Sequence, residues 1–544
     1  MPASLVVADV SLSFGPSQIL SQVSFVIGSD ARVGVIGPNG SGKSTLLRVL
    51  AGELTADRGV VELSPPQATV GYVAQERERS DEETVEGVLA RRTGVGAASA
   101  ELDLASAALG DASAASADRY ATALDRWLAL GGGDFDVRVP EVLADVGLAG
   151  EMRTRRLAEL SGGQLARVGL AAILLGRYDV LLLDEPTNDL DFAGLELLER
   201  FVTSRRGAVV VVSHDRAFLE RTVTSVVELA EHPHTASVFA GGFASYQAER
   251  ATRRAHAEED YELYAAKKGD LEERARRQRQ WAAAGRAKAK KRPSDHDVAQ
   301  RDFRLNRTEK LASKVRISER ALDRLEEVEK PFESWQLHLE IAAAPRGSDV
   351  VARLDSAVIE RGTFRLGPID FELRYGDRVA ITGPNGSGKT TLIEALLGRM
   401  ALSKGTQHLG KSVVLGELDQ LRSVVSTNAP LLDAFRSALG EPRPTAELRS
   451  LLAKFGLGAD HVARAANTLS PGERTRALLA LFMAKGVNLL VLDEPTNHLD
   501  LPAIEQLESA LESYEGTLIL VSHDRRLLES VATKVSIDLE ARRS

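Results

Sequence analysis

Two glycine-rich runs carry the clearest chemistry in the sequence. They read Gly37-Pro38-Asn39-Gly40-Ser41-Gly42-Lys43-Ser44, followed by Thr45, and Gly383-Pro384-Asn385-Gly386-Ser387-Gly388-Lys389-Thr390, followed by Thr391. Each run lies between an apolar stretch typical of a strand and a pattern typical of a helix, so its backbone N–H groups would surround phosphates at a helix N-terminus. Lys43 and Lys389 would contact the β- and γ-phosphates, and Ser44 and Thr390 would bind Mg²⁺. A plain glycine-rich turn is the alternative, which the repeated context disfavours.

A pair of acids follows an apolar run in each half of the chain. Asp184-Glu185 ends one run and Asp493-Glu494 ends the other. The first acid of each pair would hold Mg²⁺ through water, and the second would polarise the water that attacks the γ-phosphate. Such a pair is often only the solvated end of a strand. Its position downstream of each phosphate loop favours catalysis.

The motifs recur because the chain is a tandem duplication. The phosphate loops lie 346 residues apart, whereas Ser161 and Ser470, like His214 and His523, lie 309 apart. The first copy therefore has about 36 additional residues between Gln75 and the serine.

A different segment separates the two copies. Residues 246–330 are almost free of glycine and rich in Arg, Lys, Glu and Ala, which predicts helix. A breaker at Arg292–Asp295 indicates an antiparallel helical hairpin with its tip near residues 285–300. Its second half should have an apolar seam at Leu311, Val315, Ser318, Leu322 and Leu325. The predicted domains are therefore 1–245, 246–330 and 331–544.

The hairpin differs in charge from the rest of the chain. The whole chain has a net charge of -9, but residues 246–330 contain about 23 basic and 17 acidic residues. Nine basic residues follow one another without an acid between them: Arg274, Arg276, Arg277, Arg279, Arg286, Lys288, Lys290, Lys291 and Arg292. Such a run is typical of a surface that binds phosphate backbones, with Trp281 and Phe303 available to pack on sugar or base. A solvated charged helix is the commoner origin of a charge run.

Further motifs resemble those of one family. Leu160-Ser161-Gly162-Gly163-Gln164 resembles the signature of ATP-binding-cassette (ABC) proteins, and Leu469-Ser470-Pro471-Gly472-Glu473-Arg474 resembles its variant in the ABC-F subfamily. Glu185–Asp191 and Glu494–Asp500 look like the ABC-F acidic motif and the D-loop that follows it, and Ser213–Arg216 and Ser522–Arg525 look like the switch-histidine motif. The resemblance implies an α/β fold of two tandem P-loop ABC nucleotide-binding domains joined by an antiparallel α-helical hairpin linker.

It also implies two composite sites for ATP and Mg²⁺. Site one would combine Lys43, Ser44, Gln75, Asp184, Glu185 and His214 with Ser470, Gly472 and Glu473. Site two would combine Lys389, Thr390, Gln420, Asp493, Glu494 and His523 with Ser161, Gly162, Gly163 and Gln164. In the family the histidines contact the γ-phosphate, and Gln75 and Gln420 occupy the position of its Mg²⁺ and water contact.

Two positions depart from the family pattern. Phe14 matches the aromatic residue that stacks on adenine, but the matching position in the second copy is Glu360, so site two should bind its base less tightly unless Phe364 substitutes. Pro471 removes a backbone donor where the first copy has Gly162, and we expect this to tune the site.

The resemblance implies a cytoplasmic, Mg²⁺-dependent ATPase that binds the ribosome. In the family the linker enters the ribosomal exit site and contacts the peptidyl-site tRNA, so residues 274–307 would face RNA. The additional segment, which includes Gly94–Ala117, could be an arm that touches ribosomal protein or RNA, a helical subdomain or a flexible loop. We expect a monomer, since the two domains pair within the chain. The sequence leaves open whether the protein protects ribosomes from an antibiotic or tunes translation.

The alternative is the ATP-binding subunit of a membrane exporter with a separate membrane partner. No stretch of the chain is apolar enough to span a bilayer. Other tandem-cassette classes, the ribosome-recycling ABC-E proteins and the excision-repair ATPase, use cysteine-bound clusters or metals. The chain has no cysteine, which excludes them.

Overall fold

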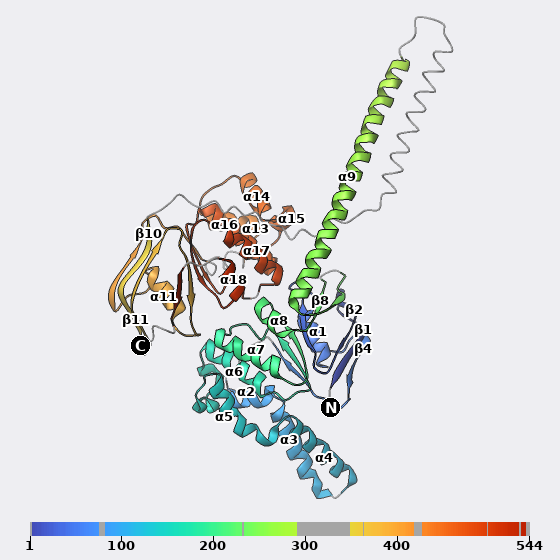
Figure 1. Cartoon of the computed structure of the whole chain (residues 1–544), viewed down its shortest axis with the longest axis vertical. Coiled ribbons are helices and arrows are strands. Elements are labelled where there is room, and N and C mark those ends of the chain that lie inside the picture. The colour runs from blue at the N-terminus through green and yellow to red at the C-terminus, as the bar shows by residue number, and fades with distance from the viewer. Residues whose placement is uncertain are drawn as a thin grey trace. The chain divides into compact units, whose positions relative to one another are not determined.

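The computed structural model describes residues 3–74, 82–111, 113–230, 233–290, 349–362, 364–417, 427–497, 499–531 and 535–539. Two compact units are present: Met1–Ala244 together with Trp335–Ser544, and Ser245–Ser334. Within the first unit we call residues 3–244 the N-terminal half and residues 349–539 the C-terminal half (Figure 1). Gln75, Gln420, Lys291, Arg292 and the predicted apolar seam lie outside the described residues. The two boundaries between the three predicted domains stay predictions.

The N-terminal half contains two sheets. Strands β1 (Ser4–Phe14), β2 (Ser17–Ile27) and β4 (Arg58–Ser64) form an antiparallel sheet in the order β2-β1-β4. The second sheet has the order β5-β6-β7-β3-β8-β9 and is parallel except for β9. Its strands are β3 (Arg32–Ile36), β5 (Val70–Val73), β6 (Val180–Asp184), β7 (Ala208–Val212), β8 (Ser225–Leu229) and β9 (Ala236–Ala240). Strands β6 and β7 are buried throughout, as expected for continuous apolar runs covered on both faces.

The helices of this half follow the motifs. They are α1 (Lys43–Leu50), α2 (Val85–Arg92), α3 (Val95–Ala108), α4 (Ala114–Ala129), α5 (Phe135–Asp145), α6 (Gly162–Leu175), α7 (Phe192–Ser204) and α8 (Arg216–Thr222). Short 3₁₀ turns cover Leu109–Asp111, Gly132–Asp134, Gly150–Thr154 and Leu157–Glu159. The additional segment of the first copy is thus helical where it is described, and α3 and α4 lie side by side, joined by a hydrogen bond of 2.9 Å from Trp127 Nε1 to Ser99 Oγ (Figure 1).

The C-terminal half repeats this architecture. Strands β10 (Val350–Arg361), β11 (Phe364–Arg374) and β13 (Lys404–Leu409) form the antiparallel sheet. The parallel sheet has the order β14-β15-β16-β12-β17, with β12 (Arg378–Thr382), β14 (Leu415–Glu417), β15 (Leu489–Asp493), β16 (Thr517–Val521) and β17 (Val535–Asp538). Its helices are α11 (Lys389–Leu396), α13 (Leu431–Leu439), α14 (Thr445–Lys454), α15 (Ala459–Ala463), α16 (Pro471–Lys485), α17 (Leu501–Glu512) and α18 (Arg525–Ser530), and Ala466–Thr468 forms a 3₁₀ turn. The predicted fold class, two tandem α/β P-loop domains, is confirmed.

Helix α9 (Phe243–Lys290) is 48 residues long and runs into the second unit. Proline is absent from it, and ion pairs one turn apart, such as Glu249–Arg253, Arg254–Glu258 and Glu273–Arg277, support it. The first arm of the predicted hairpin is therefore helical as far as the structure describes it. In the described ranges, no helix has both the length and the hydrophobicity that crossing a bilayer requires.

Candidate nucleotide-binding sites

The phosphate loop of the N-terminal half joins β3 to α1. Gly42 caps α1 with a φ of 94°, and a Cβ atom on it would lie 2.8 Å from Ile19 Cγ2, so both the backbone and the packing require glycine. The ammonium group of Lys43 donates to the carbonyl oxygens of Gly37 (2.8 Å) and Pro38 (2.9 Å). Burial lowers the pKa of Lys43, while the charges of Glu185, Asp500 and Asp184 act against that shift. The lysine thus folds back over its own loop, where phosphate oxygens would accept its hydrogen bonds.

The acids of this half stand at the carboxyl end of β6, next to the loop, because parallel strands end at the same edge of a sheet. Asp184 accepts hydrogen bonds from Tyr72 (3.2 Å) and Ser44, and burial raises its pKa. Glu185 has a left-handed φ of 50°, and its N–H donates to the carbonyl oxygen of Val212 at 2.9 Å. Burial also raises the pKa of the Glu185 carboxyl group.

The switch histidine follows β7 and faces this glutamate. His214 Nε2 lies 3.2 Å from Glu185 Oε1. Burial, with a further contribution from Lys43, lowers the pKa of His214 to about 3. The imidazole is therefore neutral near pH 7, and it can donate one hydrogen bond without adding a charge.

The C-terminal half has the same arrangement. Lys389 Nζ donates to the Gly383 carbonyl oxygen at 2.7 Å and lies 3.1 Å from His523 Nε2. Thr390 Oγ1 donates to Asp493 Oδ2 at 3.0 Å. Glu494 has a φ of 45°, and burial raises its pKa to about 8, while burial lowers the pKa of His523 to about 4. The structure thus brings together the predicted lysine, hydroxyl, acid and histidine groups of both copies.

The two sites contain polar atoms that suit Mg²⁺ and phosphate. Buried oxygens without a hydrogen-bond partner among the described residues are Ser41 Oγ, Asp184 Oδ1, Glu185 Oε1 and Oε2, Ser387 Oγ and Glu494 Oε1. A buried acceptor of this kind is costly unless a ligand or water occupies its free side. A cavity of about 480 Å³ adjoins Lys43, Ser44, Asp184 and Glu185, and one of about 440 Å³ adjoins Lys389, Thr390, Asp493 and Glu494. These residues fit a Mg²⁺-bound nucleotide.

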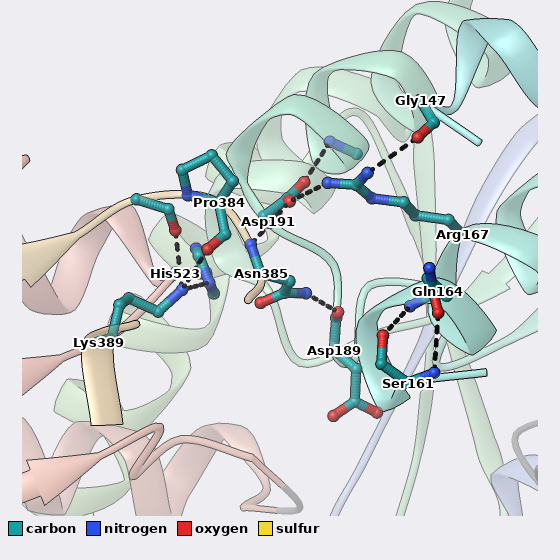
Figure 2. A network of polar contacts seen from close by, with 12 residues as sticks. Gly147, Ser161, Gln164, Arg167, Asp189, Asp191, Pro384, Asn385, Lys389 and His523 are labelled. Atoms are coloured by element: carbon teal, nitrogen blue, oxygen red, sulfur yellow. Dashed lines mark hydrogen bonds and ion pairs between the residues drawn. The ribbon is translucent and has the colours of Figure 1, made fainter. Parts of the chain in front are cut away.

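Each phosphate loop is also contacted by an aspartate from the other half. The N–H of Asn39 donates to Asp500 Oδ2 at 3.0 Å. The N–H of Asn385 donates to Asp191 Oδ2 at 3.1 Å, a contact that Figure 2 shows. Figure 2 shows that Arg167 also donates to Asp191, at 3.2 Å, while the Asn385 side chain donates to the Asp189 carbonyl oxygen at 2.7 Å. Asp191 and Asp500 belong to motifs recognised in the sequence, but we did not predict them as site residues. They are 309 residues apart, like the other repeated site residues, and this spacing could have identified them.

The signature helices begin with capping boxes. Ser161 Oγ accepts from the N–H of Gln164 (3.3 Å), and the Gln164 side chain accepts from the N–H of Ser161 (2.9 Å; Figure 2). Ser470 and Glu473 form the same pair at 3.3 and 2.7 Å. Gln164 and Glu473, predicted as ATP-binding residues, therefore cap α6 and α16 in this structure.

The signature of the N-terminal half lies against the opposite phosphate loop. A Cβ atom on Gly163 would come within 2.9 Å of Asn385 Cβ. A cavity of about 300 Å³ is lined by Gly162 and Gly163 together with Asn385, Gly386, Glu494 and His523. The cavity of about 480 Å³ beside Lys43 and the cavity of about 440 Å³ beside Lys389 are each lined by residues of one half only. The structure therefore places Gly162 and Gly163 beside Asn385, Glu494 and His523, and the complete composite sites stay predictions.

The outer ends of the two cavities differ. Phe14, which is 52% exposed, lines the cavity of site one, whereas Arg361 and Phe364 line that of site two. Glu360, which we matched to Phe14 from sequence spacing, does not line it. Strand pairing gives the reason: Phe14 pairs with Ser17 across the turn, and Arg361 pairs with Phe364, so Arg361 occupies the place of Phe14.

A phosphate loop after the central strand, an acid pair on a nearby strand and a switch histidine, all present twice, define a pair of P-loop nucleotide-binding domains. Comparison with known proteins agrees. The family model described as ABC transporter matches residues 20–188 and 366–497. The putative ATP-binding protein YdiF of Bacillus subtilis is 32% identical over 98% of this chain and 79% of its own length.

Other relatives have more specific names. The tylosin resistance ATP-binding protein TlrC of Streptomyces fradiae is 35% identical over 94% of this chain and 92% of its own length. The energy-dependent translational throttle protein EttA of Mycobacterium tuberculosis is 30% identical over 97% of this chain and 89% of its own length. Among solved structures, the RNase-L inhibitor matches 97% of this chain and 87% of its own with a TM-score of 0.56, but at 19% identity, so that likeness concerns the fold alone. The chain belongs to the ABC family and, within it, to the ABC-F group.

Proposed function

We propose that this ABC-F protein is a cytoplasmic Mg²⁺-dependent ATPase that binds the ribosome in its ATP-bound form and leaves it after hydrolysis. The contacts of Asn39 with Asp500 and of Asn385 with Asp191 carry this proposal. Because each phosphate loop touches the opposite half, a nucleotide bound at the loop stabilises the closed pair of halves, and loss of its γ-phosphate weakens that closure. ATP binding and hydrolysis would then shift the population between closed and open forms.

The residues of each site have distinct roles in this proposal. Lys43 and Lys389 bind the β- and γ-phosphates, while Ser44 with Asp184, and Thr390 with Asp493, hold Mg²⁺. The metal ion neutralises charge on the phosphate oxygens when it is bound.

The glutamates and histidines then act on the attacking water. Glu185 and Glu494 orient it and polarise it, and the neutral imidazoles of His214 and His523 donate to the γ-phosphate. Gln75 and Gln420 complete the metal and water contacts. The signature residues Ser161 and Ser470 contact the γ-phosphate from the opposite half.

The ribosome is proposed as partner from the helical linker, residues 246–330. Four of the nine predicted RNA-binding residues, Arg274, Arg276, Arg277 and Arg279, have described side chains, and all four are exposed on α9. The backbone of Arg286, Lys288 and Lys290 continues the same helix. Guanidinium groups in this density attract phosphate backbones, so we propose that this region faces rRNA and the peptidyl-site tRNA. The names of EttA, a translational throttle, and TlrC, a resistance protein, support a role in translation or ribosome protection.

Sedimentation tests this proposal. The double variant Glu185→Gln/Glu494→Gln should retain ATP and co-migrate with ribosomes in a sucrose gradient that contains ATP, while its ATPase rate falls at least about 10²-fold. The wild-type protein without nucleotide should stay at the top of the gradient. If the double variant hydrolysed ATP at the wild-type rate, the roles assigned to Glu185 and Glu494 would be refuted. Pelleting with membranes instead of ribosomes would support the ATP-binding subunit of a membrane exporter.

A further inference from the structure

The two sites differ where the base of a nucleotide would lie. In the N-terminal half the β1–β2 turn holds Gly15 with a φ of 60°, and in the C-terminal half the β10–β11 turn holds Gly362 with a φ of 61°. The residue before each glycine closes the hairpin, as Phe14 pairs with Ser17 and Arg361 with Phe364. The same backbone position thus carries a phenyl ring at site one and a guanidinium group at site two.

The two hairpins differ by one irregularity in their strand pairing. The pairing of β1 with β2 shifts between Leu12 and Ser13, which leaves Ile19 as an additional residue. The pairing of β10 with β11 continues from Ile359 to Glu360 without such a shift. Arg361 is consequently 22 residues before Gly383, whereas Phe14 is 23 residues before Gly37.

The aromatic ring of site two lies elsewhere, against the phosphate loop. A Cβ atom on Gly388 would be 2.6 Å from Phe364 Cζ, just as one on Gly42 would be 2.8 Å from Ile19 Cγ2. Phe364 therefore takes the place of Ile19, and each of these two side chains lines the cavity of its own site. Arg361 takes the place of Phe14, and the substitution of Phe364 for that ring on the base stays a prediction.

The guanidinium group of Arg361 is available for a ligand. The neighbouring Glu360 pairs with Arg365 at 3.7 Å, whereas Arg361 makes no ion pair or side-chain hydrogen bond with any residue that the structure describes. It is exposed, and it lines the same cavity as Lys389, Thr390 and Thr391. A cation at the mouth of that cavity can meet the base that the phosphate loop presents.

We propose that Arg361 recognises the base at site two by donating hydrogen bonds, and that this makes site two more tolerant of guanine than site one. Guanine offers two neighbouring acceptors, O6 and N7, which match the two donors of a guanidinium fork, whereas adenine offers N7 beside an amino donor. A phenyl ring at Phe14 stacks on either purine and does not distinguish these edges. The ligand of site two is thus a purine nucleoside triphosphate, with GTP accepted beside ATP. This inference rests on the proposed function.

The test measures each site separately in the full-length protein. Lys43→Ala leaves only site two for nucleotide, and Lys389→Ala leaves only site one. Fluorescent N-methylanthraniloyl (mant) derivatives of ATP and GTP are titrated with Mg²⁺ in both backgrounds. We expect the ratio of GTP to ATP affinity to be about tenfold higher at site two than at site one.

Three variants test whether Arg361 causes the difference in this ratio between the two sites. Arg361→Ala in the Lys43→Ala background should lower the ratio of GTP to ATP affinity to that of site one, mainly through weaker GTP binding. The neighbouring Arg365→Ala should leave the ratio unchanged, and Arg361→Phe should give site two the ratio of site one. Competition by tripolyphosphate, which has no base, should be equal before and after Arg361→Ala.

Several outcomes would overturn the inference. Equal GTP to ATP ratios at the two sites would do so, as would a ratio that Arg361→Ala does not change. Loss of tripolyphosphate competition in Arg361→Ala would place the guanidinium group on phosphate instead of the base. Failure of either background to bind any mant-nucleotide would refute the nucleotide sites themselves, and thus the proposed function.

Discussion

The two proposed catalytic glutamates stand in a backbone conformation that L-amino acids seldom adopt. Glu185 and Glu494 have φ values of 50° and 45°, and their N–H groups donate to the carbonyl oxygens of Val212 and Val521, both at 2.9 Å. Such strain persists only where the surrounding structure imposes it, and it is concentrated at functional sites. Here it turns the carboxyl group back toward the phosphate loop from the end of a straight, buried strand.

The raised pKa of Glu494 predicts a pH-dependent stability. A carboxyl group with a pKa of about 8 when folded, above its ordinary value of 4.5, holds a proton that the unfolded chain releases between those values. Stability from this group is therefore present at low pH and lost as pH rises to 8. Glu494→Gln, which cannot ionise, should raise the melting temperature by a few degrees at pH 8 and change it little at pH 5, in nucleotide-free and Mg²⁺-free buffer.

The control for this experiment is Glu512→Gln, an exposed residue at the end of α17. It should leave the melting temperature unchanged at both pH values. Glu494→Gln would contradict the burial argument if it destabilised the protein at pH 8 by as much as at pH 5.

Tyr72 gives a second prediction at the residue scale. Its hydroxyl donates to Asp184 Oδ2 at 3.2 Å, and burial together with this carboxylate raises its pKa. Groups that orient a metal ligand typically affect metal affinity about 10- to 100-fold. In the Lys389→Ala background, Tyr72→Phe should raise the Mg²⁺ concentration that gives half-maximal mant-ATP binding by about tenfold.

The C-terminal half provides the matched control. The position of Tyr72 is taken by Glu417, which pairs with Arg399 at 2.7 Å instead of with Asp493. Glu417→Gln should leave the Mg²⁺ dependence of site two unchanged in the Lys43→Ala background. If the Tyr72→Phe variant and the protein with Tyr72 needed the same Mg²⁺ concentration for half-maximal mant-ATP binding, the hydroxyl group would not orient Asp184.

At the scale of elements, two equivalent ion pairs join the halves beside the switch histidines. Arg216 of α8 donates to Glu508 of α17 from both terminal guanidinium nitrogens, Nη1 and Nη2, and Arg525 of α18 donates to Glu199 of α7 at 2.9 Å. Arg216 is only 5% exposed. A buried pair of this kind contributes little net stability when intact, but loss of one partner leaves an uncompensated charge.

A charge reversal tests the buried pair. Arg216→Glu should place two carboxylates together and lower both the melting temperature and the ATPase rate, and Arg216→Glu/Glu508→Arg should recover part of both. The coupling energy of the cycle should be about 1–3 kcal/mol. The exposed pair Arg526–Glu220, treated in the same way, should couple by less than about 1 kcal/mol. If the effects of the Arg216 and Glu508 substitutions on the melting temperature were additive, the ion pair would not join the two halves.

Sequence spacing predicted the elements better than the contacts between them. Buried strands, phosphate loops and signature serines could be identified because each depends on residues within about ten positions. The contact of Asp191 with Asn385 could not be predicted, since the two residues are 194 positions apart and their contact depends on how the two halves pack together. Arg361 was missed for a different reason: one additional residue in β2 moves the turn relative to the loop, so a constant offset of 346 selects Glu360.

At the scale of the whole molecule, charge is distributed unevenly along the chain. The net charge of -9 combines an excess of about six positive charges in residues 246–330 with an acidic remainder. In the proposed function, electrostatic attraction to RNA would therefore be local to the linker, and it would not require a basic protein overall. Binding to a ribosome should then depend on salt through the linker, and on nucleotide through the two halves.

This division predicts how linker variants behave. Replacement of Arg274, Arg276, Arg277 and Arg279 by Gln should weaken ATP-dependent ribosome binding by the Glu185→Gln/Glu494→Gln protein. The slope of log affinity against log salt should become less steep by up to about 0.7 to 0.9 per lost phosphate contact, because fewer counterions are released. The same four substitutions in the wild-type background should leave basal ATPase activity unchanged, since none of these residues lines a nucleotide cavity.

Arginines at the other end of the same helix provide the control. Arg250, Arg253 and Arg254 lie in the first turns of α9, and the latter two are paired with Glu249 and Glu258. Replacing these three arginines by Gln changes the net charge almost as much as replacing the four arginines from Arg274 to Arg279. It should nevertheless leave the slope of log affinity against log salt unchanged. Binding curves from sedimentation at several KCl concentrations distinguish the two sets. If both sets lowered the slope equally, the attraction would be general to the helix, and the run from Arg274 onward would not be the RNA-facing surface.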